Sequence, residues 1–289
     1  MLTRRDFLAG SAATLAASAL HAADAPARLT IGLELYSFRD AIAKQGLPAI
    51  LAQAKAMGFD RVETGADFYG HTAADFRKLT DAAGLKVTSV HFTYDQLKKS
   101  VAPAQRDLET VGAHWAGVAW IPHTTFDSAG AQRAADDFNA WGKAFAATGH
   151  TFMYHVHGYE FGPAPQGGTN LDVLFQSTDP AQVKFQMDTF WIVVPGQDCV
   201  ALLEKYPTRW RLMHIKDLRK GAPIGNPQGR EGRADVHDSV PVGTGIIDWS
   251  KVLPLARKIG IADYFIEDES PDALTQVPQS LRYLNSRKW

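Results

Sequence analysis

Short apolar runs alternate with helical segments along most of this chain, and several of the helical segments end at a glycine. Apolar runs of about four to eight residues, rich in branched and aromatic side chains, are typical of buried strands. Longer segments of mixed polarity that stop at glycine are typical of helices. The expected strands are residues 29–36, 61–63, 85–91, 116–121, 151–157, 183–188, 211–214 and 264–267, and the expected helices are residues 48–57, 72–83, 103–111, 129–147, 171–176, 199–206, 249–259 and 271–284.

This alternation favours a parallel sheet, because each helix then returns the chain to the start of the next strand. Eight strand–helix pairs in 289 residues predict a (β/α)8 TIM barrel, an α/β fold with its helices outside a closed sheet. An open doubly wound sheet would need a glycine-rich phosphate loop after an early strand, and residues 31–36 offer none. We therefore expect a single barrel domain over residues 28–289. A long irregular loop at residues 218–247 should lie on its active face.

The N-terminal residues are predicted to be an export signal rather than part of the barrel. Arg4 and Arg5 precede an alanine- and serine-rich apolar stretch at residues 9–20. This order is typical of a twin-arginine signal peptide, here residues 1–25. The stretch is too short and too weakly apolar to span a bilayer. We expect a periplasmic or secreted protein without a membrane span.

Charge and cysteine content argue against two classes of protein. The formal net charge is −1, so no basic field is available to hold nucleic acid, and no such partner is expected. The one cysteine, Cys199, cannot form an intramolecular disulfide or a thiolate metal cluster. Whether the protein forms a homo-oligomer stays open.

Four of the apolar runs end in a carboxylate or an imidazole. In a parallel barrel all strands end on the same face, so these side chains are expected to converge there. Buried carboxylates repel one another unless a cation neutralises them. A set of three acids and one histidine suits Mn²⁺, the favoured ion, or Mg²⁺, Co²⁺ or Zn²⁺. The four residues are Glu160, Asp188, His214 and Glu267.

Two further candidates are each the second residue after a histidine. Side chains two positions apart point to the same side of a strand, so each candidate should face the same way as that histidine. Lys216 follows His214 and could bind a sugar oxygen, or it could form an ion pair with a carboxylate. His157 follows His155 and is a candidate proton donor, whereas His155 is expected to be a core histidine bonded to a neighbour.

Three more residues are expected to shape a substrate pocket. Glu63 and His91 end the second and third expected strands, which places them at the same rim. Trp191 follows Asp188 and could form an apolar wall against a sugar, or it could simply pack in the core.

The chain resembles the sugar phosphate isomerase/epimerase family, which has a xylose-isomerase-like barrel. The resemblance runs from about Leu29 to the C-terminus, and it rests on the segments 155–161, 186–191, 214–217, 242–249 and 265–267 in this order. It implies that Glu160, Asp188, His214 and Glu267 bind one metal ion. It also implies that Glu160 and Glu267 act as general acid and base, moving a proton through an enediolate. Some epimerases of the family carry a histidine where this chain has Trp191, which weakens any transfer of their substrate contacts.

The resemblance and the predicted export together favour a metal-dependent isomerase or epimerase acting on an unphosphorylated sugar or keto-sugar. Sugar phosphates are mostly cytoplasmic, so export argues against them. A lyase or hydratase acting on 3-keto-glycosides or their glucal-type products is the alternative, since the same enolisation serves it. A non-catalytic periplasmic sugar-binding protein would not need clustered carboxylates. A metal-dependent endonuclease would need a basic groove, which the sequence lacks.

Overall fold

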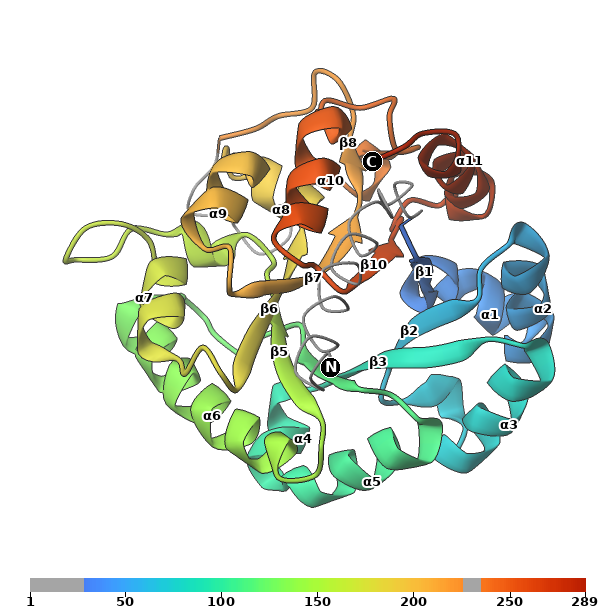
Figure 1. The fold of residues 1–289 in the computed structure, drawn as a ribbon, viewed down its shortest axis with the longest axis horizontal. Helices are drawn as coiled ribbons and strands as arrows, with labels where there is room; N and C mark the ends of the chain where they lie inside the picture. Colours follow the sequence, from blue (N-terminus) through green and yellow to red (C-terminus); the bar gives the residue numbers. More distant parts are fainter. Residues whose placement is uncertain (1–28, 226–234) are drawn as a thin grey trace, which may run out of the picture.

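Eight parallel strands close into a barrel with the helices around its outside (Figure 1). The computed structural model describes residues 29–225 and 235–289, so the signal peptide predicted at residues 1–25 lies outside the described part. The strands pair in the order β1-β10-β7-β6-β5-β4-β3-β2, and β2 pairs with β1 to complete the ring. The predicted single-domain (β/α)8 barrel is confirmed. The barrel strands are β1 (Ile31–Glu34), β2 (Arg61–Gly65), β3 (Lys86–Phe92), β4 (Trp115–Val118), β5 (Thr151–His155), β6 (Val183–Asp188), β7 (Trp210–Ile215) and β10 (Asp263–Ile266).

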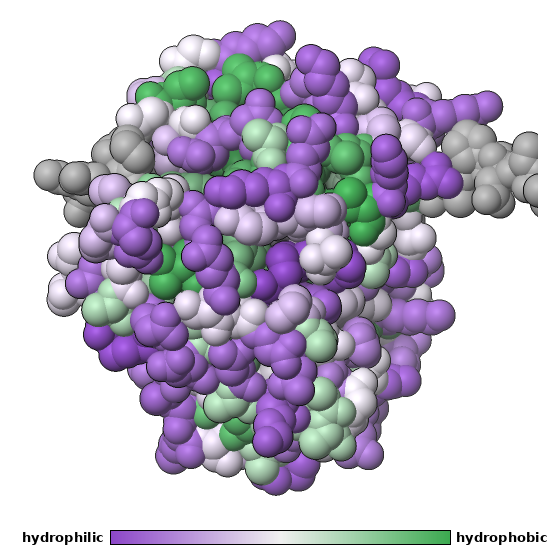
Figure 2. Space-filling model, turned by 60° about the vertical axis from the view of Figure 1, so that its left-hand side comes forward, coloured by the Kyte–Doolittle hydropathy of each residue, from purple (hydrophilic) through white to green (hydrophobic). Residues whose placement is uncertain are grey.

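The helices cover the sheet and bury the main hydrophobic core between sheet and helices. Figure 2 shows an outer face on which hydrophilic residues dominate, with smaller hydrophobic areas between them. In the described residues, no helix has both the length and the apolar character needed to cross a bilayer. The helices are α1 (Arg39–Gln45), α2 (Leu47–Met57), α3 (Ala73–Ala83), α4 (Tyr94–Lys99), α5 (Val101–Val111), α6 (Ser128–Ala146), α7 (Asn170–Ser177), α8 (Thr189–Val193), α9 (Cys199–Lys205), α10 (Trp249–Lys258) and α11 (Ala273–Asn285).

A small apolar layer lies under the site and sets which side chains can reach it. Trp115, Met153, Leu212 and Phe265 come from four strands and form a buried cluster separate from the main core. Side chains two residues apart on a strand point to the same side. The next residues on that side include His155, His214 and Glu267, which lie two positions beyond Met153, Leu212 and Phe265. The strand period therefore places two imidazoles and a carboxylate on top of an apolar floor.

Some strands end earlier in the structure than the sequence predicts. The expected strand at residues 151–157 stops at His155, and that at residues 29–36 stops at Glu34. After Glu34 the chain turns into a 3-10 helix, because the Glu34 carboxylate accepts a hydrogen bond from the Tyr36 N–H at 2.9 Å. Helices α1, α4 and α8 were not predicted, since each is too short to show a clear helical period.

The loop predicted at residues 218–247 begins and ends in ordered structure. The short strands β8 (Asp217–Leu218) and β9 (Ser239–Val240) pair antiparallel outside the barrel. The Asp217 carboxylate accepts hydrogen bonds from the backbone N–H groups of Gly243, Gly245 and Ile247 at 2.9, 3.2 and 3.2 Å. It also accepts one from the Trp249 indole N–H at 2.9 Å. One buried carboxylate thus ties the returning part of the loop to the end of β7.

We expect Asp217→Asn to destabilise the fold, because an amide nitrogen would then face N–H donors that have no other acceptor in this turn. The loss should be roughly 3 kcal/mol or more, which corresponds to a drop in Tm of roughly 6–12 °C for a protein of this size. The matched control is Asp248→Asn, whose side chain is 51% exposed and should change Tm by only about a degree or two. Thermal unfolding followed by circular dichroism compares the two. Equal Tm values for both variants would contradict the anchoring role of Asp217.

Candidate metal centre and substrate pocket

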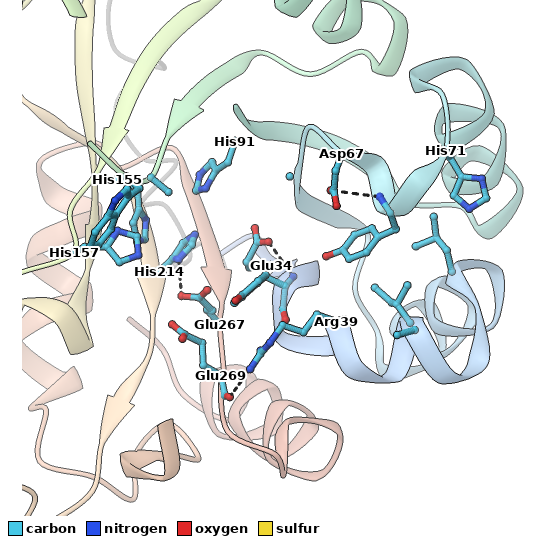
Figure 3. A pocket seen from close by; sticks show the side chains of 18 of the residues that line it. Glu34, Arg39, Asp67, His71, His91, His155, His157, His214, Glu267 and Glu269 are labelled. Atoms are coloured by element: carbon cyan, nitrogen blue, oxygen red, sulfur yellow. Dashed lines mark hydrogen bonds and ion pairs between the residues drawn. The ribbon is translucent and has the colours of Figure 1, made fainter. Parts of the chain in front are cut away.

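A pocket of about 870 Å³ opens at the carboxyl ends of the barrel strands. This is the face on which TIM-barrel enzymes hold their active sites. Figure 3 shows the imidazoles of His91, His155, His157 and His214 and the carboxylates of Glu34 and Glu267 gathered in one part of it. The predicted site residues that line the pocket are His91, His157, Trp191, His214 and Glu267.

Three of the four predicted metal ligands lie together. One ligand atom each from Asp188, His214 and Glu267 lies within 4.8 Å of the others. His214 Nδ1 is 3.0 Å from Glu267 Oε2 and 3.8 Å from Asp188 Oδ2. His155 Nε2 lies 3.9 Å from the same Asp188 oxygen, and one ligand atom of His155 also groups with His91 and His214.

This group fits a divalent cation. Asp188 Oδ2 is buried and has no hydrogen-bond partner among the described residues, although it faces two imidazole nitrogens. Donor atoms bound to one ion at about 2.1 Å lie roughly 3–4 Å apart, which is the spacing found here. The other Asp188 oxygen is occupied, since Oδ1 accepts hydrogen bonds from the N–H groups of Phe190 and Trp191 at the start of α8. The hydrogen bonds to Oδ1 fix the orientation of the Asp188 carboxylate and therefore also the position of Oδ2.

A second layer of hydrogen bonds orients both imidazoles. His214 Nε2 is bonded to Glu63 Oε1, which leaves Nδ1 to face Asp188 and Glu267. His155 Nδ1 lies 2.7 Å from Gln186 Oε1, which makes Nδ1 the protonated nitrogen and leaves Nε2 free as a donor atom. Gln186 in turn donates its amide N–H groups to both Glu63 oxygens at 3.0 and 3.1 Å. Partners of this kind fix the tautomer and the direction of metal-binding histidines.

The electrostatics of the site show an excess of buried acid. Burial raises the pKa of Asp188 to about 7, although Lys216 and His214 oppose the shift. Burial and the neighbouring Glu63 raise the pKa of Glu34 well above its usual value. Burial alone would lower the pKa of His214, but Glu63 and Glu267 raise it well above its usual value. A bound cation would offset the repulsion between these buried carboxylates, so that they could stay ionised.

Glu160 is not in the group that brings the other three predicted ligands together, and its role as a ligand stays a prediction. The strand β5 ends at His155, and Gly158 with φ 93° leads into a separate 3-10 turn that carries Glu160. The Glu160 carboxylate accepts hydrogen bonds from the Tyr154 hydroxyl and from the His157 N–H, the latter at 3.1 Å. Tyr154 packs against Phe138 of α6. The other carboxylate oxygen, Glu160 Oε2, is buried without a hydrogen-bond partner among the described residues.

Lys216 points to the site as predicted, and its partners are two carboxylates. It is 1% exposed, and its Nζ is bonded to Glu269 Oε1 and lies 3.5 Å from Glu267 Oε2. Burial disfavours the ammonium group, but Glu267 and Glu269 raise the pKa of Lys216 above its usual value. The expected alternative of an ion pair with a carboxylate is thus present, with Glu267 and Glu269 as the partners.

The remaining predicted residues divide between the pocket wall and its support. His157 and Trp191 line the pocket, and His157 Nδ1 and Trp191 Nε1 are buried atoms without a hydrogen-bond partner among the described residues. Burial lowers the pKa of His157 to about 4, so this imidazole is neutral at pH 7. His91 also lines the pocket. Glu63 is fully buried behind it and acts through His214 and Gln186.

Sequence reasoning missed three members of the site and misread a fourth. Glu269 lies two residues after Glu267, just as Lys216 lies two residues after His214. The same spacing could therefore have identified Glu269. Glu34 ends β1, as Glu63 ends its strand, and was not singled out. Gln186 gave no signal, because its role depends on the two histidines that it contacts. His155 was read as a core histidine, and one nitrogen does have that role.

The family of the chain follows from a match along most of its length. The family model of the xylose isomerase-like TIM barrel matches residues 51–287. The chain belongs to this family.

Individual relatives are more distant. An inosose dehydratase of Geobacillus thermodenitrificans is 29% identical over 143 residues, which are 47% of this chain and 46% of that protein. The chain thus spans about half the length of this curated relative. A solved structure of a sugar phosphate isomerase/epimerase from Parabacteroides distasonis is 26% identical, with a TM-score of 0.71, and the match covers 89% of this chain and 98% of that one.

A third similar structure contains a metal ion. It is the IOLI protein with a binding zinc atom, 13% identical with a TM-score of 0.68, matching 90% of this chain and 99% of that one. At this identity the likeness is one of fold. Together the comparisons support a sugar isomerase, epimerase or dehydratase family, without selecting one reaction.

We expect Asp188→Asn to lose bound metal and Glu160→Gln to keep it. The asparagine can still cap α8 through its carbonyl oxygen, so the fold should survive while the charged donor is lost. The affinity for Mn²⁺ or Zn²⁺ should fall by at least about tenfold. Metal content after dialysis, measured by elemental analysis on folded protein, checks both variants. Loss of metal in Glu160→Gln would restore Glu160 as a ligand.

Glu160 should make stability depend on pH. Burial raises the pKa of its carboxyl to about 7 from a usual value of 4.5, against hydrogen bonds from Tyr154 and His157. The folded state therefore holds this proton more tightly than the unfolded state does. Its contribution to the free energy of unfolding is fully present below about pH 4.5. It is lost as pH rises to about 7, by roughly 3 kcal/mol.

Urea unfolding of the parent and of Glu160→Gln at several pH values between about 5 and 8 isolates this contribution. The variant has no proton to lose at this position, so its stability should decline less steeply with pH. It should equal or exceed the parent in stability near pH 8. Parallel pH profiles for the two proteins would show that Glu160 does not titrate in this range.

Proposed function

We propose that this protein is a divalent-metal-dependent enzyme that removes a proton next to the carbonyl group of an unphosphorylated keto-sugar. The β substituent then leaves as water or an alcohol, or water adds in the reverse direction. One observation carries the proposal. Asp188 Oδ2, which has no hydrogen-bond partner among the described residues, faces His155 and His214, and these two histidines and the Glu269 carboxylate line one large pocket.

The residues that would hold the metal are His155, Asp188, His214 and Glu267. Two imidazoles and two carboxylates suit Mn²⁺, Co²⁺ or Zn²⁺ better than Mg²⁺, which prefers oxygen donors. A zinc atom in the IOLI structure, which shares the fold, agrees with this choice. When bound, the ion would supply Lewis-acid polarisation of a substrate carbonyl or hydroxyl oxygen.

Glu269 is the proposed proton acceptor. One of its oxygens is bonded to Lys216, and its side chain, 18% exposed, lines the pocket. Lys216 keeps this carboxylate in place. Glu267 faces His214 instead, at 3.0 Å, and is assigned to the metal. The Lys216 ammonium lies between the two carboxylates and helps to offset the negative charge that develops on the substrate.

His157 and Trp191 are the proposed contacts to the departing oxygen. Each has a buried nitrogen without a partner among the described residues, and both residues line the pocket. A neutral imidazole can donate a hydrogen bond through its N–H, as a neutral histidine does in known enzyme sites. Transfer of the α proton to Glu269 leaves an electron pair that forms a C=C bond. The β-oxygen departs with the electron pair of its C–O bond and takes up a proton from water, while Glu269 returns the α proton to the solvent; hydration is the reverse sequence.

The position of Glu160 favours elimination over proton exchange. The predicted isomerase chemistry uses two glutamates of the metal site as acid and base. Only Glu267 of that pair lies in the pocket. A relative whose name is inosose dehydratase supports loss of water from a keto compound. Isomerisation or epimerisation is the second candidate, favoured by the name of the similar Parabacteroides distasonis structure, since it shares the first proton transfer.

Incubation of the metal-loaded protein in D2O with keto-glycosides, keto-cyclitols, ketoses and aldoses tests this proposal, with products followed by NMR. We expect release of water or alcohol with a new C=C signal, or the reverse addition. Deuterium uptake without bond cleavage would replace elimination by isomerisation or epimerisation. Sugar binding without any turnover would favour the non-catalytic sugar-binding protein.

Two glutamine variants separate the proposed base from the proposed ligand. Glu269→Gln should lower kcat/KM by about 10²–10⁴-fold and keep the metal, because it removes a proton acceptor outside the metal group. Glu267→Gln should lower both activity and metal content. Turnover measured beside metal content on the same preparations makes the comparison. Activity of Glu269→Gln within a few-fold of the parent would reassign the base.

We also propose that the protein acts outside the cytoplasm. The support is the twin-arginine pattern at Arg4 and Arg5 with the apolar stretch at residues 9–20. A substrate without a phosphate group agrees with such a location. Detection of the processed protein in periplasmic or culture fractions, with Arg4 and Arg5 changed to lysine as control, would check export.

A further inference from the structure

The pocket has two ends of different chemistry. The end at the strand termini carries the histidines and carboxylates of the metal centre. The other end is lined by Ile42 and Ala43 of α1, Leu47 of α2 and the aromatic residues Tyr36 and Tyr69. Figure 3 shows His71 on the side of the pocket opposite His155 and His157. Arg39, Asp67 and His71 also line this end, so the far end combines apolar and aromatic side chains with a few polar ones.

We propose that this far end, lined by Tyr36, Ile42, Ala43, Leu47 and Tyr69, binds an aromatic aglycone. The substrate would then be a keto-glycoside of an aromatic alcohol rather than a free keto-sugar. This inference rests on the proposed function, because the aglycone is the group that leaves, or lies next to the bond that breaks, at the metal end. A pocket of about 870 Å³ is larger than one sugar ring needs and falls in the upper part of the roughly 300–1,000 Å³ range of sites for larger organic ligands.

An exposed aromatic side chain supports an aromatic ligand. Among the described residues, Tyr36 belongs to a small set of large hydrophobic side chains that stay exposed, at 48%, and its ring lines the far end of this pocket. The Arg39 guanidinium lies over the Tyr36 ring, 4.5 Å from its centroid. Aromatic rings with free area at a pocket are suited to stacking on a flat ligand. The position of Tyr36 at the pocket explains why it is not buried in the core.

The backbone at the far end is held in a rare conformation. Phe68 and Tyr69 have φ of 46° and 53°, the left-handed region that non-glycine residues seldom adopt. Phe68 is buried against Phe76, with ring centroids 5.2 Å apart. Such a conformation costs on the order of 1–3 kcal/mol and is concentrated at ligand sites. The packing of Phe68 thus holds Tyr69 at the pocket despite this cost.

The two charged side chains at this end, Arg39 and Asp67, already have protein partners, which argues against a second sugar unit as their ligand. Arg39 donates hydrogen bonds to the backbone carbonyls of Tyr36 and Glu269 at 3.1 and 3.0 Å. Asp67 accepts from the Tyr69 N–H at 3.4 Å. Ile42, Ala43 and Leu47 have no polar side-chain atoms. A sugar ring would leave several hydroxyl groups without partners here, whereas an aryl ring would not.

Kinetics with matched keto-glycosides tests the inference. The compounds share one keto-sugar and differ in the aglycone, which is methyl, phenyl or a second glucosyl unit. The parent should prefer the phenyl compound over the methyl compound by about tenfold or more in kcat/KM. Ala43→Trp should lose most of this preference, because its indole would fill the far end. Ala43 is exposed on α1, so the fold should tolerate the change.

The matched control is Lys44→Trp, an exposed neighbour on the same helix that does not line the pocket. It should keep the phenyl preference of the parent. Equal kcat/KM for the methyl and phenyl compounds, with measurable turnover, would overturn this inference and leave the proposed function intact. Preference for the glucosyl compound would replace the aryl site by a sugar site.

If neither compound is turned over, the proposed function fails, and binding decides the inference by itself. Calorimetric titration of phenyl and methyl glucosides compares affinities for the parent, Ala43→Trp and Lys44→Trp without any reaction. Tighter binding of the phenyl compound that is lost only in Ala43→Trp would support the aromatic site. Equal binding of both compounds to the parent would overturn it.

Discussion

His214 is held by carboxylates on both of its ring nitrogens, and the whole site is arranged around this contact. Nε2 is bonded to Glu63, while Nδ1 faces Glu267 and Asp188. Glu63 also accepts from Gln186, which orients His155. Without the buried Glu63, both imidazoles could rotate or change tautomer, and the donor atoms would no longer face one point. A fully buried acid behind the pocket therefore determines what the pocket can bind.

The same arrangement separates the tasks of the acidic residues. Asp188 and Glu267 face the imidazoles, Glu63 supports them from behind, and Glu269 reaches the pocket with Lys216 as its partner. Charge explains the separation, because carboxylates this close cannot all ionise without nearby cations. Lys216 supplies one positive charge, and a divalent ion would supply two more. The apolar far end of the pocket adds a region where recognition depends on shape and stacking rather than on charge.

Strand and helix patterns in the sequence were enough to predict the barrel, because buried parallel strands appear as short apolar runs separated by helical segments. The prediction failed where a strand stopped. Residues 151–157 continue an apolar pattern, yet β5 ends at His155, and Gly158 turns the chain so that Glu160 bonds to Tyr154. A two-residue difference in strand length thus accompanies the position of Glu160 outside the group of Asp188, His214 and Glu267.

By itself the sequence determined the fold class and the face of the barrel on which Asp188, His214 and Glu267 meet, since strand period and parallel order are local properties of the chain. Only the tertiary structure decided that His155 lies beside Asp188, that Gln186 and Glu63 contact the two imidazoles, and that Glu269 lies beside Lys216. These roles depend on contacts between residues far apart in the chain, such as Glu63 with His214. Local patterns contain no information about such pairs, because the barrel closure brings them together.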